Sequence, residues 1–360
     1  MPTTEPSPLR SLQTGTWFKL ICGASYQALP AIRNLAIAYS LAGADCIDVA
    51  ADVAVIAAAR EGIAVAETIG RQEKRMFSRP WLMVSMSAGE DPHFRKAWFD
   101  ADKCPASCTR PCESVCPADA IDRQGVVRDR CYGCGRCLPI CPLGLIKTQS
   151  QPTTVDTIAH DVLSQVDALE IHTQVGQLDA VKSLWQTLQP YTHHLKLVSI
   201  SCPDGDGFIN YLKQIRALIK ATQSIDASVM WQTDGRPMSG DIGKGTTHAA
   251  IKLAQKVLAS DLEGFVQLAG GTNQYTAGKL RSLNLLPQNS NLSNGGDRTV
   301  TGVAYGSYAR HALMPVLGET LYLEEVSADL WKAVALAESL VQSLKPSVTT
   351  RQHLEVMPDL

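Results

Sequence analysis

The chain has 360 residues, of which 45% are hydrophobic and 19% are charged, and its formal net charge is −2. This composition is that of a globular protein with a full core, long enough for one large domain or two ordinary ones. The small net charge gives no electrostatic reason to expect nucleic acid or an anionic membrane as the main partner. The polar, proline-rich start of the chain predicts no signal peptide, and no apolar run is long enough to span a bilayer.

The first part of the chain alternates between short apolar runs and longer amphipathic ones. We expect strands at Trp17–Cys22, Cys46–Ala50 and Trp81–Met86, separated by helices at Leu29–Leu41 and Ala54–Ile69. Strands and helices in this alternation are typical of a parallel sheet built from βαβ units. Lys19 is unusual inside the first strand, and it is expected either to point into the mouth of a barrel or to lie at an edge.

Eight of the eleven cysteines lie in one segment, which interrupts this alternation. Its second half reads Cys131-x2-Cys134-x2-Cys137-x3-Cys141-Pro142, the ligand pattern of a bacterial-type ferredoxin. Its first half is a looser version of the same pattern. One tight loop can bind three irons of a small cubane cluster, and in two-cluster ferredoxins the fourth thiolate comes from the other motif. We therefore expect two [4Fe-4S] clusters, one bound by Cys104, Cys108, Cys112 and Cys141, the other by Cys131, Cys134, Cys137 and Cys116.

Disulfides and zinc are the alternatives for these thiols. Disulfide frameworks are typical of small secreted domains, and zinc sites of paired Cys-x2-Cys motifs with a long spacer, so both fit the pattern less well. The run from Cys104 to Cys112 has an additional residue in each gap. We expect its cluster to be the more labile, converting to a [3Fe-4S] form on oxidation, unless Pro105 and Pro111 stiffen the longer gaps and make both clusters equally robust.

After the cysteines the alternation resumes and continues almost to the end of the chain. We expect five more strands, at Ala168–His172, Leu195–Ser201, Ser228–Gln232, Gly264–Leu268 and Gly302–Tyr305. The expected helices are Val155–Val166, Leu178–Leu188, Phe208–Lys220, His248–Leu258, Tyr275–Leu283 and Ala328–Leu344. Eight βα units predict a (β/α)8 TIM-like barrel, and a doubly wound open sheet is the alternative.

The cysteine segment would then be a ferredoxin-like insertion after strand three, at the C-terminal face where barrel enzymes have their active sites. The predicted boundaries are residues 1–99 for the first part of the barrel, 100–150 for the insertion and 151–347 for the rest of the barrel. Residues 1–14 and 348–360 are predicted to be tails.

Two glycine-containing loops follow the last two strands. Gly270 and Gly271 follow strand seven, and Gly306, Ser307 and Arg310 follow strand eight. In barrels these loops commonly bind phosphate through backbone N–H groups and a helix N-terminus, which leaves FMN open as a cofactor. The alternative is that glycine simply ends the strands.

Three other features suggest chemistry less strongly. The stretch Gly240-Asp-Ile-Gly-Lys-Gly-Thr246 departs from the P-loop pattern and favours a glycine-rich turn. Ser199-Ile-Ser-Cys-Pro203 resembles flavin-dependent dihydroorotate and dihydropyrimidine dehydrogenases, but Cys202 has no neighbouring base in the sequence and is expected to be structural. Polar residues end several strands, as they do in the solvated loops of any soluble barrel.

Read end to end, the sequence resembles the cyanobacterial light-dependent period family. The resemblance is carried by Trp17-Phe-Lys-Leu-Ile-Cys-Gly-Ala-Ser25, by Ala44-Asp-Cys-Ile-Asp-Val-Ala-Ala-Asp52 and by the double cysteine run. It implies a cytoplasmic iron–sulfur redox sensor, more a regulator than an enzyme, which passes light and redox information to the Kai circadian clock. Its implied partners are clock proteins, with quinone or ferredoxin as candidate redox carriers. The alternative is an iron–sulfur oxidoreductase that passes electrons to a flavin or substrate at the barrel mouth; its catalytic residues are unknown.

Overall fold

The computed structural model describes residues 6–89, 94–150, 155–221, 227–235, 243–287, 298–318 and 320–345. Eight parallel strands close into a barrel in the order β1-β12-β11-β10-β9-β8-β3-β2, which confirms the predicted (β/α)8 architecture and excludes the open sheet. The barrel strands are β1 (Trp17–Gly23), β2 (Cys46–Ala50), β3 (Trp81–Ser87), β8 (Ala168–His172), β9 (Leu197–Cys202), β10 (Ser228–Asp234), β11 (Phe265–Ala269) and β12 (Gly302–Tyr305).

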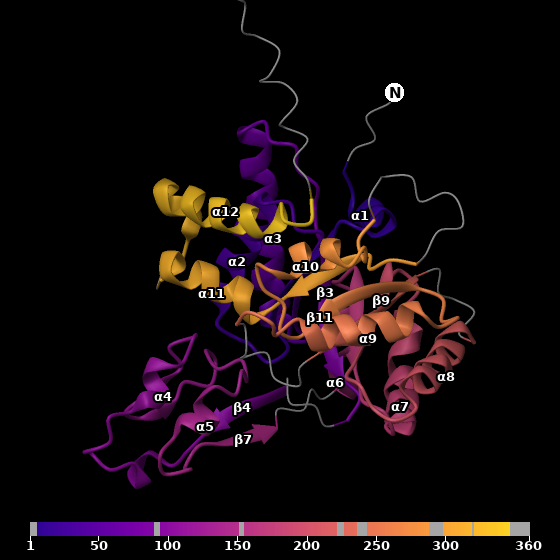
Figure 1. Ribbon diagram of the computed structural model, residues 1–360. Coiled ribbons are helices and arrows are strands. Elements are labelled where there is room, and N and C mark those ends of the chain that lie inside the picture. The colour runs from indigo at the N-terminus through magenta and orange to yellow at the C-terminus, as the bar shows by residue number, and fades with distance from the viewer. Residues whose placement is uncertain are drawn as a thin grey trace, which may run out of the picture.

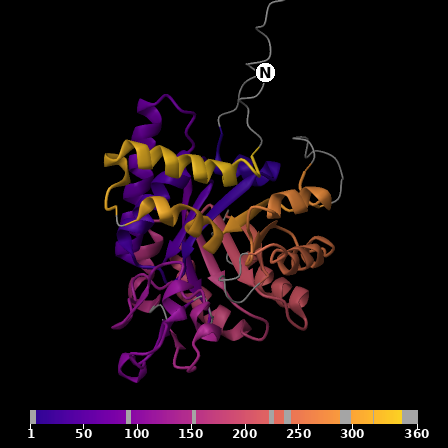
Figure 2. The ribbon, with the colours of Figure 1, turned by 60° about the vertical axis from the view of Figure 1, so that its left-hand side comes forward.

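Helices surround the barrel, as the successive views in Figure 1 and Figure 2 show. They are α2 (Leu29–Leu41), α3 (Val53–Gln72), α6 (Val155–Leu163), α7 (Leu178–Leu188), α8 (Phe208–Lys220), α9 (His248–Leu258), α10 (Thr276–Ser282), α11 (Ser307–Leu317) and α12 (Ser327–Val341). Short 3-10 turns, η3 (Gln189–Tyr191) and η4 (Leu323–Glu325), add to this layer. Helix α11 was not among the predicted helices, because Pro315 interrupts its helical pattern.

The N-terminal end of the barrel is filled by apolar side chains. Trp17, Trp81, Leu197 and Met230 form part of one buried cluster there, together with Leu12. Leu12 belongs to helix α1 (Pro8–Thr14), which begins at a Ser7 cap and ends at Gly15 in a left-handed conformation. The prediction of a tail over residues 1–14 is therefore wrong for residues 8–14, because this short helix covers the barrel end.

The middle of the barrel is polar and completely buried. The Lys19 ammonium lies 2.5 Å from Glu170 Oε2 and 3.1 Å from Asp48 Oδ2, and none of the three side chains is more than 1% exposed. Burial acts to lower the pKa of Lys19, but the two carboxylates raise it above its ordinary value. Burial acts to raise the pKa of Glu170, but the charge of Lys19 lowers it below its usual range. Lys19 thus points into the barrel and not toward an edge, but it lies in the buried middle and not at the mouth, where the sequence analysis had placed it as one alternative.

Further hydrogen bonds satisfy the remaining oxygens of this buried group. Glu170 accepts from Ser199 Oγ at 2.8 Å and from Gln232 Nε2 at 2.7 Å, and Asp48 accepts from Ser85 Oγ at 2.8 Å. Each of these residues comes from a different strand, so the network joins both sides of the ring. A buried ion pair repays its desolvation only with such additional partners.

The cysteine segment forms a separate module beside the C-terminal face of the barrel (Figure 1). Its first strand, β4 (Arg95–Trp98), pairs antiparallel with its last, β7 (Lys147–Ser150), so the insertion starts a few residues before the predicted boundary at 100. Between them lie η2 (Ala101–Lys103), α4 (Pro111–Ser114), β5 (Ile121–Asp122), β6 (Gly125–Val126) and α5 (Cys137–Ile140). The predicted tail at 348–360 lies outside the described residues.

We expect replacement of Lys19 by methionine to lower the free energy of unfolding by about 3–5 kcal/mol, because two buried carboxylates lose their cation. Urea unfolding under anoxic conditions, followed by tryptophan fluorescence, measures the change. The control is Lys196→Met, which removes a half-exposed lysine 2.6 Å from Asp167 and should cost less than about 1 kcal/mol. Equal losses in the two variants would contradict the importance of the buried group.

Candidate metal centre

The four thiols of Cys116, Cys131, Cys134 and Cys137, here called the inner thiol group, line one cavity of the module. Burial, and then the neighbouring thiols Cys134, Cys131 and Cys116, raise the pKa of Cys137 to about 12. Cys116 comes from the first cysteine run and the others from the second. The structure therefore brings together the residues that crossed ligation requires.

The outer thiol group consists of Cys104, Cys108, Cys112 and Cys141. Burial and the nearby Cys108 raise the pKa of Cys104, and Cys141 acts in the same direction. Burial also raises the pKa of Cys112, with Cys141 again contributing. Cys141, from the second run, is therefore a neighbour of Cys104 and Cys112. These neighbours match the second expected ligand set, and the ligation itself stays a prediction.

Backbone amides point at several of these sulfurs. Cys131 Sγ accepts from Ala97 N at 3.4 Å, Cys116 Sγ from Ala120 N at 3.2 Å and Cys108 Sγ from Arg110 N at 3.4 Å. Burial acts to raise the pKa of Cys141, but amides of the turn from Leu143 to Ile146 lower it below its ordinary value. N–H groups directed at sulfur stabilise thiolate ligands and tune cluster potentials.

The chemistry of the donors fits iron–sulfur clusters. All eleven cysteines are described, and none forms a disulfide. Within the described residues, no three His, Cys, Asp or Glu side chains are arranged to hold a single metal ion. A cubane binds each thiolate to a different iron, so its ligands stand further apart than those of one ion.

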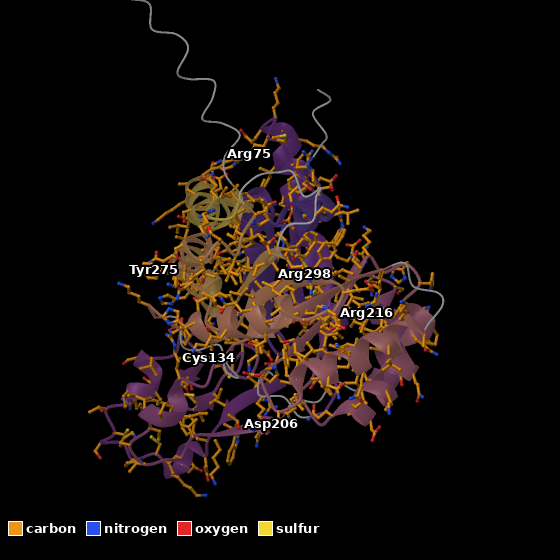
Figure 3. All side chains as sticks on the ribbon, turned by 45° about the vertical axis from the view of Figure 1, so that its right-hand side comes forward. Arg75, Cys134, Asp206, Arg216, Tyr275 and Arg298 are labelled. Atoms are coloured by element: carbon orange, nitrogen blue, oxygen red, sulfur yellow. The ribbon has the colours of Figure 1, made fainter. Side chains whose placement is uncertain are left out.

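The two groups differ in their exposure to solvent. In the outer group the loop residues Pro105, Ala106, Ser107 and Thr109 are exposed, whereas Tyr132 and Gly133 between the inner cysteines are buried. Figure 3 labels Cys134 on the part of the module that faces the barrel. The inner group is thus enclosed within the module, and the outer group lies nearer to water.

Tyr132 connects the inner thiol group to the barrel. Its ring lies edge-on to Tyr26, with centroids 5.7 Å apart, and the Arg310 guanidinium lies 3.9 Å from its centroid. Gly23, at the end of β1, has φ +128°, and a Cβ there would stand 3.3 Å from Tyr132 Cβ. Only a residue without a side chain fits comfortably, which allows the module to approach this closely.

Lys96 forms the second buried contact between module and barrel. Its ammonium donates to Gln27 Oε1 on the barrel and to the Arg128 carbonyl in the module, both at 2.8 Å. Gln27 N also donates to the Asp129 carbonyl at 3.1 Å. The module was expected to sit on the rim beside the third and fourth barrel strands, β3 and β8. Its contacts extend further, to the loop after β1.

The barrel mouth contains a cavity directly beside this contact. It provides about 50 Å³ open to the centres of water molecules, where a single water needs about 10–15 Å³ on that measure. All five residues of the predicted phosphate site line it: Gly270, Gly271, Gly306, Ser307 and Arg310. The polar strand ends that also line it are Ser85, His172, Gln232 and Asp234. Tyr132, from the cysteine module, was not foreseen, because no local pattern indicates that an insertion folds back over the mouth.

Two other features that the sequence singled out have structural roles. The first residues of the glycine-rich stretch, 240–242, lie outside the described residues. Thr246, which ends the stretch, and Thr247 donate to the Gly271 carbonyl at 2.6 and 3.2 Å. They brace the loop after β11. Cys202 is buried, and its thiol donates to the Pro203 carbonyl, in agreement with the structural role expected for it.

Known proteins match most of the chain. The model of the light dependent period A C-terminal domain matches residues 162–343, and that of the LdpA Fe-S cluster-binding domain matches residues 104–152. Light dependent period A of Synechococcus elongatus is 52% identical over 347 residues, which cover 95% of this chain and 94% of that protein. The chain belongs to the light dependent period A family. The iron–sulfur cysteine segment lies within a domain that this family shares.

Among solved structures, tryptophan synthase from M. tuberculosis aligns with 94% of this chain and 99% of its own, at 13% identity and a TM-score of 0.41. (S)-3-O-geranylgeranylglyceryl phosphate synthase from Thermoplasma acidophilum aligns with 94% of this chain and 97% of its own, at 13% identity and a TM-score of 0.38. In this family member, no described helix has the length and apolarity to cross a bilayer.

Crossed ligation predicts which cluster each cysteine variant loses. We expect Cys116→Ala to disturb the cluster of Cys131, Cys134 and Cys137, although Cys116 lies in the other run. Iron and sulfide analysis of anoxically purified protein should show about half the iron of wild type. Cys46→Ala, which changes a buried barrel thiol, is the matched control and should keep all of it. Full iron in Cys116→Ala, or zinc in the wild type, would contradict the assignment.

Proposed function

We propose that this protein is an iron–sulfur redox sensor that passes the redox state of the cell, and through it light, to the circadian clock and so adjusts the clock period. The observation that carries the proposal is the pair of four-thiol groups in a chain 52% identical to a light dependent period A protein. The proposed partners are clock proteins, with quinone or ferredoxin as electron carriers, and the proposed location is the cytoplasm.

The arrangement of the module supports sensing. When bound, two [4Fe-4S] clusters would each supply a one-electron redox centre. The exposed loops around Cys104 and Cys108 give an external carrier access to the outer thiol group. Tyr132 places the inner group against Arg310 of the barrel. An electron that enters at the outer group and passes to the inner group would thus change the charge next to the buried contact between module and barrel.

The direct test uses Synechococcus elongatus cells that lack their own light dependent period A protein. This chain should restore the dependence of the clock period on light intensity, whereas Cys134→Ala should not, because it removes an inner ligand. Cys46→Ala is the control and should behave as wild type. A Cys134→Ala strain whose period responds to light as the wild type does would contradict redox sensing through this cluster.

We further propose that the outer cluster is the labile one and loses an iron to give a three-iron form. Its loops are the exposed ones, and exposure eases access of oxidant to the iron. Oxidative titration followed by EPR should give a three-iron signal in wild type and in Cys134→Ala, but none in Cys108→Ala. A signal that persists in Cys108→Ala and vanishes in Cys134→Ala would show that the inner cluster is labile instead.

A second candidate is an oxidoreductase that uses the clusters to reduce a flavin or substrate at the barrel mouth. The cavity beside Tyr132 favours it. However, about 50 Å³ accommodates a few waters or a small ion, and FMN would require the lining to move apart. Flavin absorbance in anoxically purified protein would support this candidate over the sensor.

A further inference from the structure

The cavity at the barrel mouth contains a buried cation that its own partners do not fully satisfy. Arg310 is 3% exposed. Its Nη1 donates to the Ile21 carbonyl at 2.6 Å and its Nη2 to Ser307 Oγ at 3.1 Å. Its Nε has no hydrogen-bond acceptor among the described residues. Among the described residues its guanidinium forms no ion pair, and its close neighbours there are neutral groups and the ring of Tyr132.

The backbone around Arg310 is also arranged for an anion. Helix α11 begins at Ser307, on the wall of the cavity, and no side chain caps its N-terminus. The first N–H groups of a helix carry partial positive charge and bind oxyanions. Gly270 and Gly271, in the loop that follows β11, both have positive φ, and this loop lines the same cavity. A cation and a helix N-terminus without a side-chain cap, both on α11, therefore face one cavity together with the glycine loop after β11.

The other charged group of the cavity restricts the ligand. Asp234 lies on the wall beside Ala269, and Ser201 Oγ donates to it at 3.3 Å. A bare anion would be repelled by this carboxylate, whereas a ligand that also carries a hydroxyl or ammonium donor would be attracted. His172 and Gln232 line the side of the barrel where such a donor or acceptor would be placed.

We propose that the barrel mouth binds a small oxyanion, a phosphate or a carboxylate with a hydrogen-bond donor at its other end, and that this ligand is coupled to the inner cluster through Arg310 and Tyr132. The volume of about 50 Å³ has room for a few waters, which limits the ligand to about the size of phosphate, acetate or glycine. The binding site stands on the geometry of the cavity alone. The coupling rests on the proposed function, because it requires a cluster at the inner thiol group.

The sign of the coupling follows from charge. The Arg310 guanidinium lies 3.9 Å from the ring centroid of Tyr132, which follows Cys131 in the inner thiol group. Its positive charge favours the reduced, more negative cluster. An anion bound to Arg310 offsets that charge and lowers the reduction potential. By reciprocity, the reduced protein binds the anion more weakly than the oxidised protein. Ligand affinity would thus report the redox state of the module.

Calorimetric titration of anoxic, oxidised holoprotein with inorganic phosphate, acetate and glycine, at constant ionic strength, tests the site. We expect at least one probe to bind, and glycine to bind better than acetate if the donor meets Asp234. Arg310→Gln should weaken binding about tenfold or more, because it removes charged hydrogen bonds. Arg33→Gln is the matched control: it removes another buried guanidinium, bound to Glu61 and Glu324 on the outer helices.

Arg310→Lys keeps the charge and serves if Arg310→Gln does not fold; the loss of the planar fork should still weaken binding. The same titration on dithionite-reduced protein should give weaker binding than on oxidised protein. No binding of any probe at millimolar concentration, or equal affinity in the wild type and the Arg310 variants, would overturn the site. Equal affinity in both redox states would overturn the coupling. Iron and sulfide analysis tests the proposed function separately.

Discussion

The contact between Tyr132 and Arg310 is the interaction on which the relation of the two parts of this protein depends. A desolvated cation over an aromatic ring stabilises by about 2 kcal/mol, and here the ring belongs to a loop between two cluster ligands. Lys96 adds a second buried cation, which bridges Gln27 and the Arg128 carbonyl. Together these contacts hold Tyr132 and β4 of the module against the barrel.

The barrel contributes rigidity more than reactivity. The apolar side chains at its N-terminal end and the Lys19–Glu170–Asp48 group in its middle fill the interior. A cavity remains at the mouth, lined by Gly306 and the loop after β11. A rigid body of this kind converts a change of charge in the module into a change at one cavity.

The sequence predicted the parts of the fold that depend on local periodicity. All eight barrel strands and most helices are found within a few residues of their predicted limits, because buried parallel strands and amphipathic helices have strong patterns. Among the elements it missed, Arg95–Trp98 and Lys147–Ser150 form β4 and β7 only because the two ends of the insertion meet, and α11 was missed because Pro315 interrupts its pattern. α1 was missed because its start is proline-rich and polar.

The candidate site, too, was predicted only where local sequence determines it. The cysteine spacing identified both thiol groups, since cluster ligation is encoded in consecutive residues. Arg310 and Lys19 each have a contact partner more than a hundred positions away, Ile21 for Arg310 and Glu170 for Lys19. Nothing in the local sequence indicates such pairs. The role of Tyr132 likewise depends on where the module docks.

The central claim is that the redox state of the module reaches the barrel mouth through the buried contact. Hydrogen exchange of anoxic protein, compared between its oxidised and reduced forms, tests it most directly. The account predicts changes in protection at residues 23–28, 128–134 and 306–310, where module and barrel meet, with β9 and β10 unchanged. Changes confined to the exposed loops around Cys104 and Cys108, with none at the mouth, would contradict it.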